Sequence, residues 1–257
     1  MFKIALDAGH GLYTPGKRCL KAFDPEETRE WWLNNRICDR IEELMKAYGG
    51  CEILRMDDTM GESDIPLVNR TTAANRWGAD FYLSVHHNAG IGGGAGGGPV
   101  TIAYTGASAK VLEYQKIVHN SFIARVGNWG NRSEPMPKQN LHVLRETNMP
   151  AVLIECGFMD SRVDVPLILS DVFAEKAAQG LVNALVKIGG LKKKEDTNME
   201  NKFVDIKGHY AEKAVKDLHA FGIVNGVDDT HFNPDAPITR GQAAILVRNV
   251  IRYITGK

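Results

Sequence analysis

Residues that can bind a metal ion or move a proton follow three apolar runs of the sequence. They are His10 after KIAL (3–6), His86 after DFYLSV (80–85) and Glu155 within AVLIEC (151–156). In an open parallel sheet, such positions meet beyond the carboxyl ends of the strands. Two imidazoles and a carboxylate are typical ligands of a catalytic zinc ion, and a further carboxylate close by can act as a general base. The pattern therefore indicates metal-assisted hydrolysis at one edge of a sheet.

A fourth candidate, Glu30, lies on the helix that follows the first predicted strand. The apolar stripe of this helix consists of Leu33, Ile37, Ile41 and Leu44. Stepping back from this stripe by three or four residues reaches Asn34 and then Glu30, so Glu30 is placed on the buried face of the helix. Glu26, one turn earlier on the same stripe, is its rival.

Each of these residues also has an ordinary structural interpretation. A single histidine after a strand is more often satisfied by backbone groups than bound to a metal ion. Glu155 alone could be a buried acid paired with Arg145, and Glu30 alone could be a solvated charge on a helix. The convergence of four residues from four separate segments favours the metal site over these alternatives.

Strand-like and helical runs alternate through residue 188. The predicted strands cover 3–6, 51–56, 80–85, 99–104 and 151–156, and the predicted helices cover 25–48, 65–77, 107–126 and 171–188. This alternation predicts an α/β fold with a mainly parallel, twisted sheet and helices on both of its faces. The first helix is predicted to begin near residue 25, because Asp24 can cap it, Pro25 suits its first position and Glu27 completes a capping box.

The stretch LKKKEDTNMENK after Gly189 and Gly190 is charged and polar and has no periodic apolar face. Such a composition is typical of a linker. We therefore divide the chain into a domain at 1–188, a linker at 189–202 and a small helical module at 203–257. With amphipathic segments near 210–221 and 240–253, this module should have a thin core.

The composition narrows the choice of partners. Lys plus Arg and Asp plus Glu number 31 each, so no basic field points to nucleic acid. No apolar run approaches the ~20 residues needed to cross a bilayer, so no membrane partner is expected. The four cysteines show no paired motif and are interpreted as free thiols. The N-terminal MFKIALDAGHG has neither the apolar region nor the cleavage site of a secretory signal.

Four stretches of the first domain resemble the zinc-dependent N-acetylmuramoyl-L-alanine amidases, which cleave peptidoglycan. The stretches are IALDAGHG (4–11), E-x3-N (30–34), R-x4-N followed by AD-x-YLSVHHN (70–88), and LHVLRETNMPAVLIECGF (141–158). The resemblance implies that His10, Glu30 and His86 bind Zn²⁺ and that Glu155 is the catalytic acid. It also implies hydrolysis of the amide between N-acetylmuramic acid and L-alanine, and the E-x3-N match selects Glu30 over Glu26.

His86 and His87 point to opposite faces of one strand, so they cannot easily serve the same site. His86 shares a face with the small polar Ser84, whereas His87 is in phase with Val85. In the family pattern His87 occupies a variable position. We therefore expect a bystander ring at the sheet surface or at the mouth of the loop that follows. That loop, GIGGGAGGG at 90–98, could be a flexible wall of the substrate groove or simply slack.

The module at 203–257 resembles a single S-layer homology module. The shared features are F-x-D (203–205), Tyr210, G-I-V-x-G (222–226), F-x-P (232–234) and I-T-R (238–240). The resemblance implies binding to a secondary cell-wall polymer of a Gram-positive envelope, with Arg240, Asp205 and Tyr210 as candidate contacts. The pair Gly241-Gln242 departs from the Ala-Glu that is common in the family, which bears on the polymer preferred.

Arg240 is the residue that suits an acid group of such a polymer, because a guanidinium pairs bidentately with a carboxylate. An ordinary salt bridge at the start of a helix is an equal alternative for Arg240. Thr239 and Gln242 are expected to form a capping box for the last helix. Since such modules usually act as three copies, a single copy implies either weak binding or a homo-oligomer with raised avidity.

A wall-cutting amidase joined to a wall-binding module, with no visible signal, is typical of a phage endolysin. This interpretation predicts that the protein is made in the host cytoplasm without a signal peptide and acts at the cell wall after release. The alternatives are a bacterial autolysin of the same activity, a zinc peptidase acting on peptidoglycan stem peptides, and a non-catalytic cell-wall-binding protein.

Overall fold

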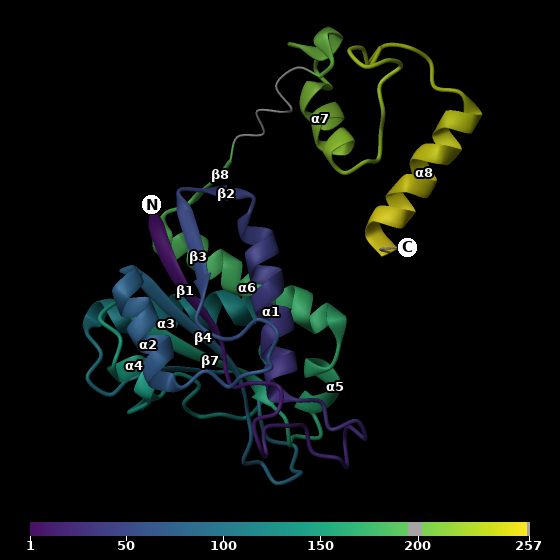
Figure 1. Ribbon diagram of the computed structural model, residues 1–257. Helices are drawn as coiled ribbons and strands as arrows, with labels where there is room; N and C mark the ends of the chain where they lie inside the picture. Colours follow the sequence, from purple (N-terminus) through teal and green to yellow (C-terminus); the bar gives the residue numbers. More distant parts are fainter. Residues whose placement is uncertain (195–201, 256–257) are drawn as a thin grey trace. The chain divides into compact units, whose positions relative to one another are not determined.

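The computed structural model describes residues 1–194 and 202–255. The chain divides into two compact units, Met1–Lys194 and Glu195–Lys257, which are described separately below (Figure 1). The part of the predicted linker at 195–201 lies outside the described residues. Among the described residues, every helix is too short or too polar to span a bilayer.

The first unit is built on a six-stranded sheet with the order β3-β1-β4-β7-β5-β6. The strands are β1 (Phe2–Ala8), β3 (Cys51–Arg55), β4 (Phe81–Asn88), β5 (Val100–Tyr104), β6 (Lys138–Gln139) and β7 (Ala151–Phe158). β3, β1, β4 and β7 are parallel neighbours, and β5 runs antiparallel to β7. The prediction of a mainly parallel sheet is confirmed, and the ends of β1, β4 and β7 therefore share one edge.

Helices cover both faces of this sheet, as predicted (Figure 1). They are α1 (Glu30–Met45), α2 (Leu67–Trp77), α3 (Ala109–Val126), α4 (His142–Arg145), α5 (Asp164–Ile168) and α6 (Asp171–Gly189). Alternate residues of β1 enter two separate cores. Ile4 and Leu6 pack with α1, α3, α5 and α6, whereas Ala5 packs on the opposite face with α2 and α4. This alternation is the period of two that a strand buried on both faces requires.

Helix α1 begins at Glu30 and not near residue 25, so that prediction was wrong. The carboxylate of Asp24 accepts hydrogen bonds from the backbone N–H groups of Glu26 at 3.3 Å and Thr28 at 2.6 Å, which closes a turn instead of capping a helix. Glu27 has a φ of 49°, a left-handed conformation that an α-helix does not admit. The turn therefore delays the helix until Glu30, which becomes its first residue.

Residues 189–194 do not behave as the start of a linker. Helix α6 continues to Gly189, and Gly190 ends it in the left-handed conformation with a φ of 58°. The two-residue strand β8 (Lys192–Lys193) then pairs antiparallel with β2 (Tyr48–Gly49). The two glycines therefore terminate a helix, and the first unit extends to Lys194.

The second unit contains a short 3₁₀ turn and two helices. They are η1 (Val204–Ile206), α7 (Glu212–Ala220) and α8 (Arg240–Thr255). Its core is thin, as expected, since Phe203, Ile206 and Val215 form the buried cluster. The predicted capping box is present at the start of α8, because the Thr239 N–H donates to Gln242 Oε1 at 2.8 Å and the Gln242 N–H donates to Thr239 Oγ1 at 3.2 Å.

Candidate active site

Three of the predicted residues meet at the carboxyl edge of the sheet. His10 Nε2 lies 3.4 Å from Glu30 Oε2, and His86 Nδ1 lies 3.0 Å from Glu30 Oε1. One ligand atom from each residue lies within 4.8 Å of the others, and the described residues contain no second group of this kind. Glu26, the rival of Glu30, is exposed to solvent and is not part of this cluster.

The charges in this cluster suit a divalent cation. Burial raises the pKa of Glu30, but the interactions with His10 and His86 outweigh burial and hold the pKa well below its usual range. Burial lowers the pKa of His86, but the Glu30 carboxylate outweighs it and raises that pKa. Glu30 Oε2 is buried without a hydrogen-bond partner. A charged carboxylate with an unsatisfied oxygen beside two imidazoles fits zinc by its donor set.

A buried arginine holds the backbone that presents His10. Arg70 is 1% exposed, and its Nη2 donates to the His10 carbonyl oxygen at 2.9 Å while its Nη1 donates to Ala8 O at 2.8 Å and to Asp7 Oδ1 at 2.6 Å. His10 itself has a φ of 69°, which is uncommon for a residue with a side chain. Arg70 and Asp7 were not predicted from the sequence as positioning residues, although both stand in the stretches that resemble the amidases.

Gly9 allows the two histidine ligands to approach each other. A Cβ atom at this position would lie 2.0 Å from Cε1 of His86, which is closer than any real contact. The side chain of Asn34 on α1 donates from Nδ2 to the Gly9 carbonyl oxygen at 3.1 Å. Glycine is therefore required at this position because the His86 ring packs against it, and Asn34 of α1 holds its carbonyl oxygen.

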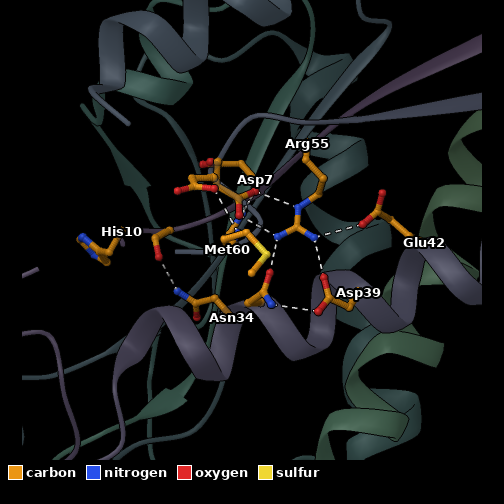
Figure 2. A network of polar contacts seen from close by, with 12 residues as sticks. Asp7, His10, Asn34, Asp39, Glu42, Arg55 and Met60 are labelled. Carbon is orange, nitrogen blue, oxygen red and sulfur yellow. Dashed lines mark hydrogen bonds and ion pairs between the residues drawn. The ribbon is translucent and has the colours of Figure 1, made fainter. Parts of the chain in front are cut away.

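A further polar network ties β3 to α1 and supports the loop after β1 (Figure 2). The guanidinium of Arg55 donates to Asp39 at 2.8 Å and to Glu42 at 3.1 Å, both on α1, and pairs with Asp57 at 2.7 Å. Asp57 Oδ1 also accepts a hydrogen bond from the Ala8 N–H at 3.1 Å. The end of β1 is thus held by buried, paired charges, which keep ligand positions within a narrow range.

His87 does not lie at the sheet surface or at a loop mouth, and this part of the prediction was wrong. Its side chain is 2% exposed, and its Nδ1 lies 2.8 Å from Asn34 Oδ1. Burial lowers the pKa of His87 to about 3, so the ring stays neutral. The opposite face of β4 is covered by α1, which turns a residue expected at the surface into a core residue. His87 is nevertheless absent from the group of three possible ligands.

Glu155 stands on β7 directly beside His86 of β4, its partner in the parallel register. Burial raises the pKa of Glu155 to about 7, although the charge of His86 opposes the rise. The alternative pair with Arg145 is not formed, because Arg145 donates to Glu146 at 2.7 Å and to Asn140 at 2.7 Å. Glu155 Oε2 is buried without a partner. A carboxyl group with a near-neutral pKa can both accept and return a proton.

The glycine-rich loop at 90–98 is anchored rather than slack. Oδ2 of Asp160 accepts hydrogen bonds from the backbone N–H groups of Gly90 at 2.9 Å, Ile91 at 2.8 Å and Gly92 at 2.8 Å. Near the other end of the loop, the Gly98 N–H donates to Asp164 Oδ2 at 2.8 Å. Two carboxylates after β7 therefore fix the loop that follows the His86 strand.

The three candidate contacts of the second unit differ in availability. Tyr210 is 90% exposed, and its ring centroid lies 4.4 Å from that of His209. Arg240 is exposed at the start of α8, and its side chain makes no ion pair within the part of the chain that the structure describes. The carboxylate of Asp205 accepts from the N–H groups of Phe232 at 3.0 Å and Asn233 at 2.6 Å. Asp205 thus holds a loop of its own unit.

Comparison with known proteins agrees with this geometry. Residues 4–187 match the family model described as N-acetylmuramoyl-L-alanine amidase. The chain belongs to this amidase family. The amidase is therefore a peptidoglycan hydrolase that cleaves the amide between N-acetylmuramic acid and L-alanine, as the sequence predicts. Residues 202–244 match the S-layer homology domain, so the amidase carries a C-terminal module of that kind.

Similar proteins come from both bacteria and a phage. The amidase is 34% identical over 193 residues to the N-acetylmuramoyl-L-alanine amidase CwlM of Bacillus licheniformis, covering 75% of this chain and 71% of that protein. It is 32% identical to the sporulation-specific N-acetylmuramoyl-L-alanine amidase of Bacillus subtilis, covering 77% and 72%. It is 31% identical to the endolysin of Bacillus phage SPP1, covering 74% and 67%.

A solved structure confirms the fold of the first unit. The catalytic domain of CwlV, an N-acetylmuramoyl-L-alanine amidase from Bacillus (Paenibacillus) polymyxa var. colistinus, superposes with a TM-score of 0.66. The identity is 22%, and the match covers 75% of this chain and 100% of that domain. This neighbour has the same mixed α/β architecture.

The comparisons overturn the expected location. We expected a protein made in the host cytoplasm without a signal peptide that reaches the wall only after release. The S-layer homology domain, together with cell-wall amidases such as the sporulation-specific enzyme of Bacillus subtilis, points instead to a secreted, cell-wall-associated protein. The two kinds of domain imply binding to peptidoglycan and to a cell-wall polymer. What the domains bind is stronger evidence of location than the composition of the first residues.

Proposed function

We propose that the amidase is zinc-dependent, with His10, Glu30 and His86 as the residues that hold the ion. The observation that carries this proposal is the convergence of their ligand atoms around a buried carboxylate oxygen without a hydrogen-bond partner. Zinc in such a site acidifies water and polarises a carbonyl group. Arg70 and Asn34 act behind the site by fixing the backbone of residues 8–10.

Glu155 is the residue that moves the proton. It accepts a proton from the attacking water as the water oxygen adds to the lactyl carbonyl carbon. It then gives the proton to the nitrogen of L-alanine as the C–N bond breaks, so a carboxylic acid and a free amine result. In the metal-free protein, burial raises the pKa of Glu155 to about 7, which places both protonation states within reach near neutral pH. Glu155 lies beside His86, next to the metal-binding group, but is not a member of that group.

Chelation of the protein tests this assignment. After dialysis against a chelator, hydrolysis of a soluble muropeptide should fall to background, and added Zn²⁺ should restore it. Elemental analysis should find one zinc per active chain, and His10→Ala should lose this zinc in a folded protein. Full activity in excess chelator would contradict the proposal.

We further propose that residues 203–257 hold the enzyme on a secondary cell-wall polymer of a Gram-positive envelope, while residues 1–188 carry the chemistry. The exposed Arg240 and Tyr210 are available to such a polymer, whereas Asp205 acts by holding the loop of Phe232. A homo-oligomer formed through this module would raise avidity.

A further inference from the structure

Lys17 is held beside the catalytic residues by its backbone. The Glu30 N–H, which opens helix α1, donates to the Lys17 carbonyl oxygen at 3.0 Å. Next to it, the Cys19 N–H donates to the Thr28 carbonyl oxygen at 2.9 Å. These two bonds lock the segment around residue 17 against the turn before α1. The backbone position of Lys17 is therefore set by these bonds and does not depend on the contacts of its side chain.

The side chain of Lys17 reaches into the site from solvent. Its Nζ lies 3.8 Å from Glu30 Oε2, and its side chain is 43% exposed. Burial dominates the raised pKa of Glu155, and the charge of Lys17 is among the groups that oppose that rise. The ammonium is thus close to the metal-binding carboxylate, and its positive charge also acts on the residue that moves the proton.

The neighbouring cations of this loop are placed differently. Arg18 Nε is engaged by Glu27 Oε1 at 3.1 Å, and Lys21 is exposed. Lys17 alone among these three residues approaches Glu30. An ammonium on a flexible stem at this position can move by a few ångströms while its backbone stays fixed.

The charge at the site changes during the reaction. In the protein alone, the Lys17 ammonium lies 3.8 Å from the buried, negatively charged carboxylate of Glu30. If His10, Glu30 and His86 held a divalent cation, the ion would supply the positive charge next to Glu30, and the ammonium would be free to pair with another anion. In the proposed reaction, water adds to the scissile carbonyl carbon, and the carbonyl oxygen gains negative charge. A positive donor carried near that oxygen by a fixed backbone stabilises the transition state more than the ground state.

We propose that Lys17 is a further catalytic residue of the amidase, whose ammonium donates a hydrogen bond to the oxyanion formed on the scissile carbonyl. This inference rests on the proposed metal site at His10, Glu30 and His86. The only proton transferred in the reaction passes through Glu155. When the C–N bond breaks, the carbonyl reforms and the hydrogen bond weakens.

Steady-state kinetics of Lys17→Met on a soluble muropeptide test the proposal. We expect kcat to fall about 100-fold with KM nearly unchanged, because one donor to an oxyanion contributes about this much. Lys17→Arg should recover part of the lost kcat, since it retains the charge and the donors. Lys21→Met removes the same charge from the same loop and should keep the wild-type kcat. Zinc affinity, measured by competition with a chelating dye, should not weaken in Lys17→Met.

Two results would overturn the role of Lys17. A raised KM with unchanged kcat would mean that Lys17 binds the substrate equally in the ground state and the transition state. A weakened zinc affinity would mean that Lys17 only orders Glu30. A failure of the zinc proposal would appear in a different experiment, as full activity of the wild-type protein in excess chelator. In that case the effect of Lys17→Met on kcat could still be measured relative to wild type.

Discussion

The two units of the amidase differ in how far their functional residues are exposed to solvent. In the first unit, the candidate ligands and the groups behind them are buried or partly buried, and Glu30 and Arg70 are each 1% exposed. In the second unit, the candidate contacts Tyr210 and Arg240 lie at the surface of a fold whose core contains Phe203, Ile206 and Val215. One unit excludes water around charges, and the other presents charges to water.

This difference follows from what each unit must do. Chemistry on an amide requires fixed groups whose pKa values differ from those in water, which only burial and close charge pairs provide. Binding of a long, hydrated polymer requires accessible side chains, and repeated weak contacts can supply the affinity. A large core is therefore needed in the first unit and can be dispensed with in the second.

Replacing each of the two adjacent histidines with alanine should distinguish the metal ligand His86 from His87, which supports the site. His86→Ala should lose zinc and lower activity on the order of 10³-fold, because a metal ion contributes several kcal/mol to transition-state stabilisation. His87→Ala should keep zinc but lower the free energy of unfolding by about 2–4 kcal/mol, because it empties a buried site and breaks the contact with Asn34. Zinc content and urea unfolding measure the two effects. Loss of zinc from His87→Ala alone would invert the assignment.

The fold of the first unit, and the meeting of His10, Glu30 and His86 at one edge of its sheet, could be predicted from the sequence because both depend on local patterns. The alternation of apolar runs gives strands and helices, and a parallel sheet brings strand ends to one edge. The helix start was misjudged, since the Asp24, Pro25 and Glu27 pattern is shared by a helix cap and by the turn that forms here. Local signals do not distinguish the two when a later residue, Glu30, can also begin the helix.

Residues that act through long-range contacts could not be predicted in this way. Arg70 bonds to the backbone of residues 8 and 10 only after α2 packs beside β1, and Lys17 approaches Glu30 only through a turn. His87 was placed at the surface because strand phase tells which face a side chain is on, but not what covers that face. The motif that contains Arg70 was the one signal that could have found it.

Removal of the second unit should affect attachment and not chemistry. A chain that ends at Lys194 keeps both cores of the first unit and the pairing of β8 with β2. It should hydrolyse soluble muropeptides with unchanged kcat and should be retained on purified walls at least about tenfold less than the full chain, since linked binding sites raise local concentration. Sedimentation with walls and kinetics on soluble substrate measure the two properties. Equal retention of both chains would show that the first unit alone supplies attachment.

The smallest expected effect concerns Glu155 in the absence of metal, where burial should make the charged carboxylate unfavourable. Its pKa is raised from the ordinary value of 4.5 to about 7, so the folded state binds a proton more tightly than the unfolded state does. Stability is therefore lost as pH rises from about 4.5 to about 7, and the loss is complete above this range.

Glu155→Gln imitates the protonated acid and should be more stable than wild type by about 1–2 kcal/mol at pH 8 but not at pH 4. All four tryptophans (Trp31, Trp32, Trp77 and Trp129) lie in the first unit, so their fluorescence during urea unfolding in chelator reports on this unit alone. Glu52→Gln, at an exposed position on β3, is the matched control and should show no such dependence on pH. If Glu155→Gln and wild type differ equally at both pH values, the carboxyl group does not titrate near neutrality, and its buried setting is not what prepares it to exchange protons.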